Sequence, residues 1–202
     1  IASAEEDAMR QAGEDYPDWI DRYLELPDTI PQRVGDLAQE IAAEYDNAYD
    51  KADALQDYVR TMTYNDQVAA PPAGVDPVDY FLFESQEGYC NYYASAMAVM
   101  LRSQGVPARV VSGYAQGEFD EATSSYRVRA SNAHTWVEVY FPGYGWIQFE
   151  PTASIPIASA ASSAASSSVA LPVKGQISWR PVRMAKAMSM TRSPSSIDSR
   201  TH

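Results

Sequence analysis

The sequence predicts an α+β domain in which a helix beginning at a cysteine packs on an antiparallel sheet. The helix is indicated by the run from Cys90 to Gln104, which contains neither proline nor glycine and ends at Gly105, a residue that commonly follows a helix. The sheet is indicated by several alternating apolar and polar segments after Gly105, separated by polar or glycine-containing turns. Helices followed by a run of strands are typical of an α+β arrangement.

Three helical segments are expected before the cysteine. Residues 1–27 form a lead-in, in which Trp19, Ile20 and Tyr23 pack as a short helix. The next helix has Thr29 as its cap and Pro31 in its first turn, and its apolar residues recur at a spacing of three to four. A further amphipathic helix spans 48–62, and the proline-containing stretch 67–78 is expected to be a loop.

Four strands are expected after the cysteine-bearing helix. They are separated by a polar loop at 115–125 and by the turn sequence PGYG, and they span residues 106–114, 126–130, 134–141 and 146–150.

The last part of the chain has a different composition. Residues 158–170 are almost all Ala and Ser, which is typical of a linker. We therefore divide the chain into the lead-in 1–27, a catalytic domain 28–154, and an Ala/Ser linker with a basic, disordered tail at 155–202 that has no catalytic role.

Charge argues against nucleic acid as a partner. The net charge is −12, and residues 1–154 contain nine basic and 26 acidic residues. Such a surface repels nucleic acid and anionic membranes. We find no apolar run long enough to span a bilayer and no signal peptide. Because the chain begins at Ile1, we expect it to be part of a longer protein.

Cys90 is the candidate nucleophile. It is the only cysteine, and at the first turn of a helix a thiolate is stabilised by the helix dipole and by free N–H groups. The backbone N–H of Cys90 could also donate to an oxyanion. Taken alone, a single cysteine is more often a small buried apolar residue than a nucleophile.

His134 is the candidate base for this thiol. The only other histidine is His202 at the end of the chain, so Cys90 has one credible partner. Trp136 lies two residues away on the same strand face and is the best candidate to shelter the pair, although packing is the more common role of such a residue.

Together these residues resemble a known family. The run GYCNYYASAMAVMLRSQGVPARVVSGY, followed by AHTWVEVYFPGYGWIQFEPT, is similar in order and spacing to the bacterial transglutaminase-like domain, and the similarity extends over residues 28–153. It implies a papain-like fold with a Cys-His-Asp triad, in which Cys90 is the nucleophile and His134 the base. Glu150 occupies the position of the family's Asp.

Glu150 is a suitable orienting residue because a longer carboxylate still accepts a hydrogen bond from an imidazole and stabilises its cation. Glu138 lies on the same strand face as His134, but four residues along a strand span about 13 Å, which is too far for a contact.

The triad requires a particular hairpin register. If Tyr140 pairs with Trp146, Glu150 lies opposite Trp136 and diagonal to His134, at a Cα separation of about 7–8 Å. A two-residue turn at Gly143 and Tyr144 would instead place Glu150 on the other face. We therefore expect a wider loop or a bulge near residues 141–145.

The resemblance implies acyl transfer at protein or peptide amides, with an amine resolving a thioester on Cys90. Two alternatives remain open: hydrolysis of the thioester by water, and a non-catalytic interaction module. No cofactor or metal is implied, and no EF-hand pattern is present. The resemblance also implies a location outside the bacterial cytoplasmic membrane, with a tether in the parent protein.

Overall fold

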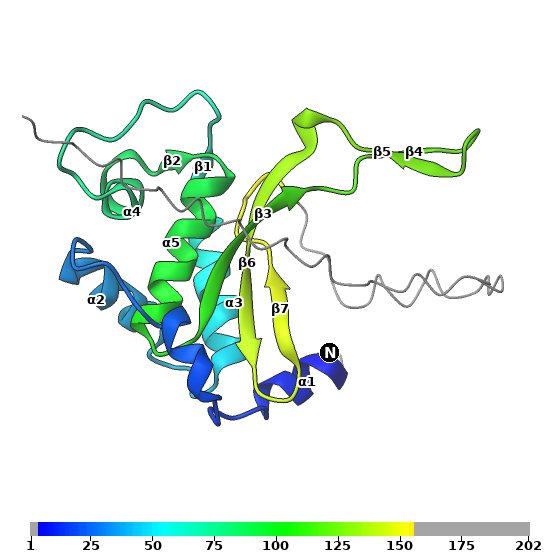
Figure 1. The fold of residues 1–202 in the computed structure, drawn as a ribbon. Helices are drawn as coiled ribbons and strands as arrows, with labels where there is room; N and C mark the ends of the chain where they lie inside the picture. The colour runs from blue at the N-terminus through cyan, green and yellow to red at the C-terminus, as the bar shows by residue number, and fades with distance from the viewer. Residues whose placement is uncertain (1–3, 156–202) are drawn as a thin grey trace, which may run out of the picture. The chain divides into compact units, whose positions relative to one another are not determined.

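The computed structural model describes residues 4–155, and the predicted linker and tail lie outside this range apart from Ile155. The helical elements and the strands follow one another along the chain as shown in Figure 1. The helical elements are α1 (Ala4–Arg10), η1 (Asp18–Tyr23), α2 (Gln32–Ala42), α3 (Ala48–Val59), α4 (Pro77–Tyr80), η2 (Phe81–Ser85), α5 (Cys90–Ser103) and η3 (Ala130–Asn132). The strands are β1 (Thr63–Tyr64), β2 (Glu87–Gly88), β3 (Ala108–Tyr114), β4 (Glu118–Asp120), β5 (Ser125–Arg127), β6 (Ala133–Phe141) and β7 (Gly145–Phe149).

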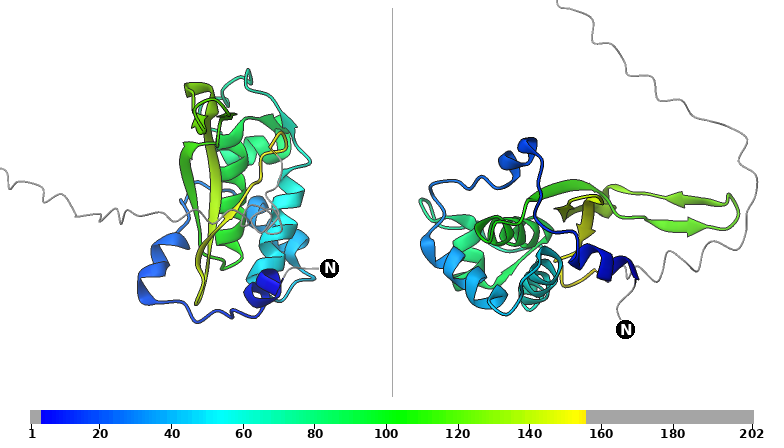
Figure 2. Two further views of the ribbon diagram at one scale, coloured as in Figure 1. Left: turned by 90° about the vertical axis from the view of Figure 1, so that its right-hand side faces the viewer. Right: turned by 90° about the horizontal axis from the view of Figure 1, so that it is seen from below.

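The central sheet has three antiparallel strands in the order β3-β6-β7. One face of β6 carries Val137, Val139 and Phe141, which are fully buried. Helix α5 packs on β3 and β6 at this core, and α3 packs beside α5. Figure 2 shows these helices on one side of the sheet. Because side chains alternate along a strand, His134 and Trp136 point to the opposite face.

One predicted strand lies elsewhere than expected. Residues 125–127 form β5, which pairs with β4 in a separate two-stranded hairpin and not with the central sheet. Figure 1 shows this hairpin extending away from the sheet. The prediction of a strand over 126–130 and a loop over 115–125 was therefore wrong in part. In the structure Ala130 begins a 3-10 turn, and Glu118–Asp120 is a strand.

The predicted hairpin register is confirmed. Tyr140 pairs with Trp146 and Val137 pairs with Phe149. The connection is wide: the carbonyl of Phe141 accepts a hydrogen bond from the Tyr144 N–H at 3.0 Å, and Gly143 and Gly145 have φ of 82° and 78°. Pro142 before a glycine with positive φ is typical of a type II turn.

The two N-terminal amphipathic helices form, but their ends differ from the prediction. The N-cap of α2 is Pro31, and the Thr29 hydroxyl instead lies 3.5 Å from a carboxylate oxygen of Asp76. Helix α3 ends at Val59, and its N-cap is Asn47, whose side chain accepts from the Asp50 N–H. A side-chain acceptor satisfies one of the unpaired N–H groups of a first helical turn.

The lead-in packs on the outer face of the sheet. The rings of Trp19 and Tyr23 in η1 contact those of Tyr140 and Trp146, with centroids 5.2 Å apart for Trp19–Tyr140 and 4.7 Å for Tyr23–Trp146. Ile20 is almost completely buried. The expected short helix at Trp19–Tyr23 is thus present, as a 3-10 helix. The proposed domain boundaries at residues 27/28 and 154/155 remain predictions.

Within residues 4–155, no helix combines the length and the apolar character needed to cross a membrane.

Candidate active site

Cys90 is the first residue of α5. The N-cap residue Tyr89 is extended, and its side chain makes no capping hydrogen bond. No capping side chain therefore occupies the N–H groups of the first turn of α5. The approach to the helix is held by β1 and β2, in which Tyr64 pairs with Gly88. The thiol is half-buried and free, and Sγ lies 3.8 Å from Oδ1 of Asn91. The structure therefore places the predicted nucleophile at a helix start.

His134 lies at the beginning of β6, opposite Gly113 on β3. Its side chain is 9% exposed, and its ring stacks on Trp136 with a centroid separation of 6.3 Å. Trp136 in turn lies over Gly113, where an added Cβ would come within 2.8 Å of the indole. Glycine at this position therefore permits the packing that supports the imidazole.

Glu150 and His134 form a buried pair. Oε2 of Glu150 lies 2.6 Å from Nε2 of His134, and the carboxylate side chain is 7% exposed. The other ring nitrogen, Nδ1, is not used by this contact. An acceptor at one nitrogen favours the tautomer that carries its proton there and stabilises the doubly protonated ring.

Glu150 follows the last residue of β7, so the sheet does not hold its backbone. One residue of α3, Gln56, and the C-cap of that helix, Arg60, do so instead. The Glu150 N–H donates to Oε1 of buried Gln56 at 2.8 Å, and the Glu150 carbonyl accepts from Nη1 of Arg60 at 2.7 Å. The same guanidinium donates to the carbonyls of Thr152 at 2.8 Å and Ile155 at 2.9 Å.

The Glu150 side chain is also fixed by its own segment, because Oε1 accepts from the Thr152 N–H at 3.0 Å. Each carboxylate oxygen thus has one partner: Oε1 accepts from the Thr152 N–H, and Oε2 lies against the imidazole of His134. No sequence signal pointed to Gln56 or Arg60, which contact Glu150 across 94 and 90 residues.

Glu138 does not belong to this group. Its carboxylate accepts from Nε of Arg109 at 2.8 Å, and these two residues are paired across β3 and β6. The sequence-based exclusion of Glu138 as a partner for His134 agrees with this placement.

Three further polar residues, Thr135, Asn91 and Tyr64, lie at the site. The Thr135 hydroxyl donates to Oδ1 of Asn91 at 2.7 Å, which ties the start of α5 to β6. Burial raises the pKa of Tyr64, and the negative charges of a Cys90 thiolate and of Asp66 raise it further. The Tyr64 phenol is therefore close enough to the nucleophile to sense its charge, and it remains protonated at neutral pH. None of these three residues was predicted; for Asn91, adjacency to Cys90 was the available signal.

Among residues 4–155, no cluster of three or more His, Cys, Asp or Glu side chains is arranged to hold a metal ion.

Comparison with known proteins identifies a family whose match includes Cys90, His134 and Glu150. The family model of the Transglutaminase-like superfamily matches residues 35–151. The chain is 48% identical over 151 residues to the uncharacterized protein YebA of Bacillus subtilis, which covers 71% of this chain. It is 37% identical over 131 residues to a protein-glutamine gamma-glutamyltransferase of Pseudomonas aeruginosa, which covers 65% of this chain. The match covers 20% of each of these relatives, so the chain spans about a fifth of their length.

Among solved structures, the periplasmic domain of TgpA from Pseudomonas aeruginosa is similar, with a TM-score of 0.61 and 33% identity. The similarity covers 68% of this chain and 48% of that one.

Proposed function

The chain belongs to the transglutaminase-like superfamily, as its motifs predicted, and we propose that it catalyses acyl transfer from a glutamine side-chain amide of a protein or peptide to a primary amine. The observation that carries this proposal is the buried His134–Glu150 hydrogen bond at 2.6 Å, in a chain whose only cysteine begins α5. A nucleophile, a base and a residue that orients the base are the requirements of thiol catalysis. The name of the Pseudomonas aeruginosa relative supports the choice of glutamine.

In the proposed first half-reaction, His134 takes the proton of the Cys90 thiol, and the thiolate attacks the carbonyl carbon of the amide. The N–H of Cys90 donates to the oxyanion that forms. The carbon–nitrogen bond then breaks as His134 returns its proton to the departing nitrogen. Ammonia leaves, and a thioester remains on Cys90.

In the second half-reaction, a primary amine attacks the thioester and gives a proton to His134 as the Cys90 thiolate leaves. The new amide is released, and the thiolate–imidazolium pair is restored. Glu150 takes part in neither proton transfer; its role is to hold the imidazole and to stabilise its cation.

The test is mass spectrometry of a glutamine peptide incubated with the protein, with and without an excess of a primary amine. We expect the mass of the amine to be added to the peptide, with release of ammonia, and we expect Cys90→Ala to prevent both. Deamidation or cleavage with no amine added would overturn acyl transfer in favour of hydrolysis. No reaction at all, with Cys90 unreactive to thiol probes, would favour a non-catalytic module.

We also propose that this domain acts outside the cytoplasmic membrane, because the solved relative is a periplasmic domain. A membrane-impermeant maleimide applied to intact cells should label the parent protein at Cys90. Equal labelling of wild type and Cys90→Ser, or labelling of Cys90 only after cell lysis, would contradict this placement.

A further inference from the structure

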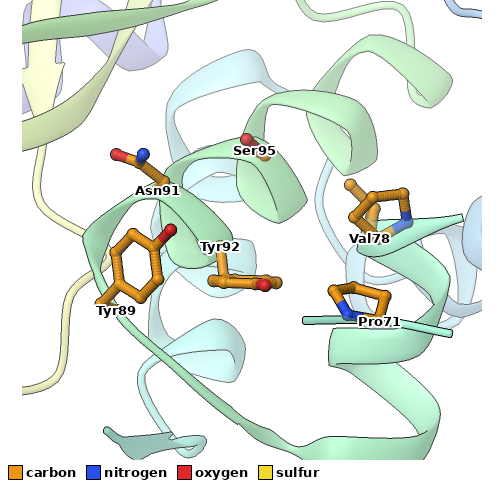
Figure 3. Close-up of a pocket in the computed structure, with 7 residues that line it drawn as sticks. Pro71, Val78, Tyr89, Asn91, Tyr92 and Ser95 are labelled. Atoms are coloured by element: carbon orange, nitrogen blue, oxygen red, sulfur yellow. The ribbon is translucent and has the colours of Figure 1, made fainter. Parts of the chain in front are cut away.

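A cavity of about 190 Å³ lies against the start of α5. Tyr89 and Asn91, the chain neighbours of Cys90, are both among its lining residues. In Figure 3, Tyr89 and Tyr92 stand on one side and Pro71 and Val78 on the other. The cavity therefore lies at the helix start that carries Cys90, although Cys90 itself does not line it.

The aromatic wall of this cavity is preformed. The ring of Tyr92 is 5.1 Å from that of Tyr89 in an edge-on arrangement and 5.8 Å from that of buried Phe81. It also lies over Gly88, where an added Cβ would come within 2.9 Å of Tyr92. Edge-on and offset ring contacts of this kind are favourable, so Tyr92 is held in place without a ligand.

The opposite wall is anchored as well. The side chain of Asp76 caps α4 by accepting from the N–H groups of Val78 at 2.9 Å and Asp79 at 3.1 Å. Asp79 is buried and is bound through both carboxylate oxygens by Arg33 of α2. Small-molecule and side-chain sites are commonly preformed in this way.

The lining is apolar with a polar edge. It consists of Pro71, Pro77 and Val78, the two tyrosines, and the uncharged residues Asn91 and Ser95, so no charged side chain lines it. A charged occupant would lose its hydration there without an ion partner. The volume exceeds that of an engineered cavity of about 150 Å³ that binds benzene, so one ring or one branched aliphatic side chain fits.

From this geometry we propose that the cavity receives an apolar side chain, aromatic or branched aliphatic, of the acyl-donor peptide, from a residue one or two positions away from the reacting glutamine. Ser95 is five residues along the helix from Cys90, which is about 7.5 Å at the rise of an α-helix. Two residues of extended peptide span about 6.6 Å. The inference rests on the proposed function in naming a peptide as the substrate.

The test uses glutamine peptides that differ only in having Leu, Phe, Gly or Asp at each of the two positions on either side of the glutamine. Binding is measured by calorimetry to the full chain carrying Cys90→Ala, which cannot turn the peptides over. Burial of one Leu or Phe side chain corresponds to about a ten- to hundredfold gain in affinity. We expect that gain over Gly at one position, and weaker binding with Asp there.

The variant Ser95→Phe, made in the same Cys90→Ala background, fills the cavity, and Ser95→Ala is its matched control. Ser95→Phe should remove the preference and leave binding of the Gly peptide within about twofold, whereas Ser95→Ala should keep the preference. In the wild-type active site, iodoacetamide should alkylate Cys90 at an unchanged rate in both variants.

The outcomes separate the two proposals. Equal binding of all peptides, a preference for Asp, or a preference that survives Ser95→Phe would overturn the cavity assignment. Leu-dependent binding without turnover by the wild-type protein would overturn the proposed reaction and keep the cavity as a peptide site. If Ser95→Phe does not fold, as judged by its thermal transition, Ser95→Leu provides the same test with a smaller side chain.

Discussion

At the residue scale, the candidate site depends on two contacts of one imidazole. Glu150 binds Nε2 of His134, and stacking on Trp136 holds the ring plane. Both side chains of this hydrogen-bonded pair are largely buried, so removing one partner leaves a buried polar group of the other unsatisfied. The substitutions below therefore probe orientation of the base as well as charge.

Replacement of Glu150 should lower activity in a graded way. Glu150→Gln keeps the size but loses the charge, and we expect kcat to fall by about 10²–10⁴-fold, as in other triads that lose the third residue. Glu150→Asp keeps the charge but is one methylene shorter, and we expect a smaller loss. The control is Glu138→Gln, on the same face of β6 but paired with Arg109, which should keep kcat within about twofold. Unchanged kcat in Glu150→Gln would remove Glu150 from the triad.

Alkylation offers a test of the base that needs no substrate. Because Cys90 is the only cysteine, iodoacetamide reports on it alone. A neighbouring imidazole promotes the thiolate, so His134→Ala should slow alkylation at pH 7 by about tenfold or more, and Cys90→Ala should abolish it. Equal rates in wild type and His134→Ala would show that the two residues do not act together.

At the scale of elements, α3 determines where the end of β7 lies. Gln56 and Arg60 hold the backbone of Glu150 and of the residues that follow it. These bonds hold the backbone of a residue that lies just beyond the end of β7. We infer that α3 positions the carboxylate without touching a substrate.

Arg60→Ala should therefore lower kcat with little change in KM, because the carboxylate loses its alignment while the substrate surface stays intact. Loss of hydrogen bonds to buried carbonyls should also reduce stability by about 1–3 kcal/mol. Arg60→Lys should recover part of the kcat, and Thr61→Ala, one residue further along, should leave it unchanged. If kcat and the Cys90 alkylation rate are unaffected in Arg60→Ala despite a lower Tm, the role of Arg60 is structural only.

Helix α3 also contains an acidic residue, Asp53, whose charged form is disfavoured in the folded protein. Burial raises the pKa of Asp53, and the neighbouring carboxylates of Asp57, Asp50 and Glu6 raise it further. A carboxyl group whose pKa is higher in the folded state than in the unfolded state costs stability once the pH exceeds its unfolded value of about 3.9. The cost grows as pH rises through the folded-state pKa and then persists to neutral pH.

Asp53→Asn should accordingly raise Tm at pH 7, and the gain should vanish near pH 3, where both forms are uncharged at this position. Asp57→Asn, on the exposed side of α3, serves as the control and should give a smaller gain. Thermal unfolding monitored by circular dichroism at several pH values provides the measurement. A gain that is the same at pH 3 and pH 7 would show that charge is not its cause.

At the scale of the whole molecule, both faces of the central sheet are covered over part of their area. Helices α3 and α5 cover one face, and the aromatic residues of η1 cover the end of the other that is distant from His134. The outer face of β6 thus changes from the candidate site at His134 to packed aromatic rings at Tyr140. The lead-in therefore contributes to the stability of the domain that carries the site.

Ile20→Ala should destabilise the protein by about 2–5 kcal/mol, the usual cost of truncating a fully buried aliphatic side chain. Trp19→Ala should cost less, because about half of this side chain is already exposed. Chemical denaturation of both variants gives the comparison. A loss below 1 kcal/mol for Ile20→Ala would indicate that the lead-in packs only weakly on the domain.

Local sequence patterns were sufficient for the main helices and for the strands of the central sheet. The absence of proline and glycine from Cys90 to Gln104 predicted α5, and alternation predicted β6 and β7. The register that brings Glu150 to His134 was predicted from the requirement of the triad, because a slip of one residue reverses every side chain and would place Glu150 on the other face. The motifs themselves predicted the family and its α+β papain-like fold, which the comparisons confirm.

Only the tertiary structure decided what holds those residues in place. Gln56 and Arg60 reach Glu150 across about ninety residues, and such contacts leave no periodic trace in either segment. The pairing of β5 with β4 and not with the central sheet was missed for the same reason, since alternation shows that a strand has two faces but not which strand lies beside it. Local patterns thus predicted the main helices, the strands of the central sheet and the face on which their side chains lie, whereas long-range packing determined the β4–β5 hairpin, the support of Glu150 and the cavity at the start of α5.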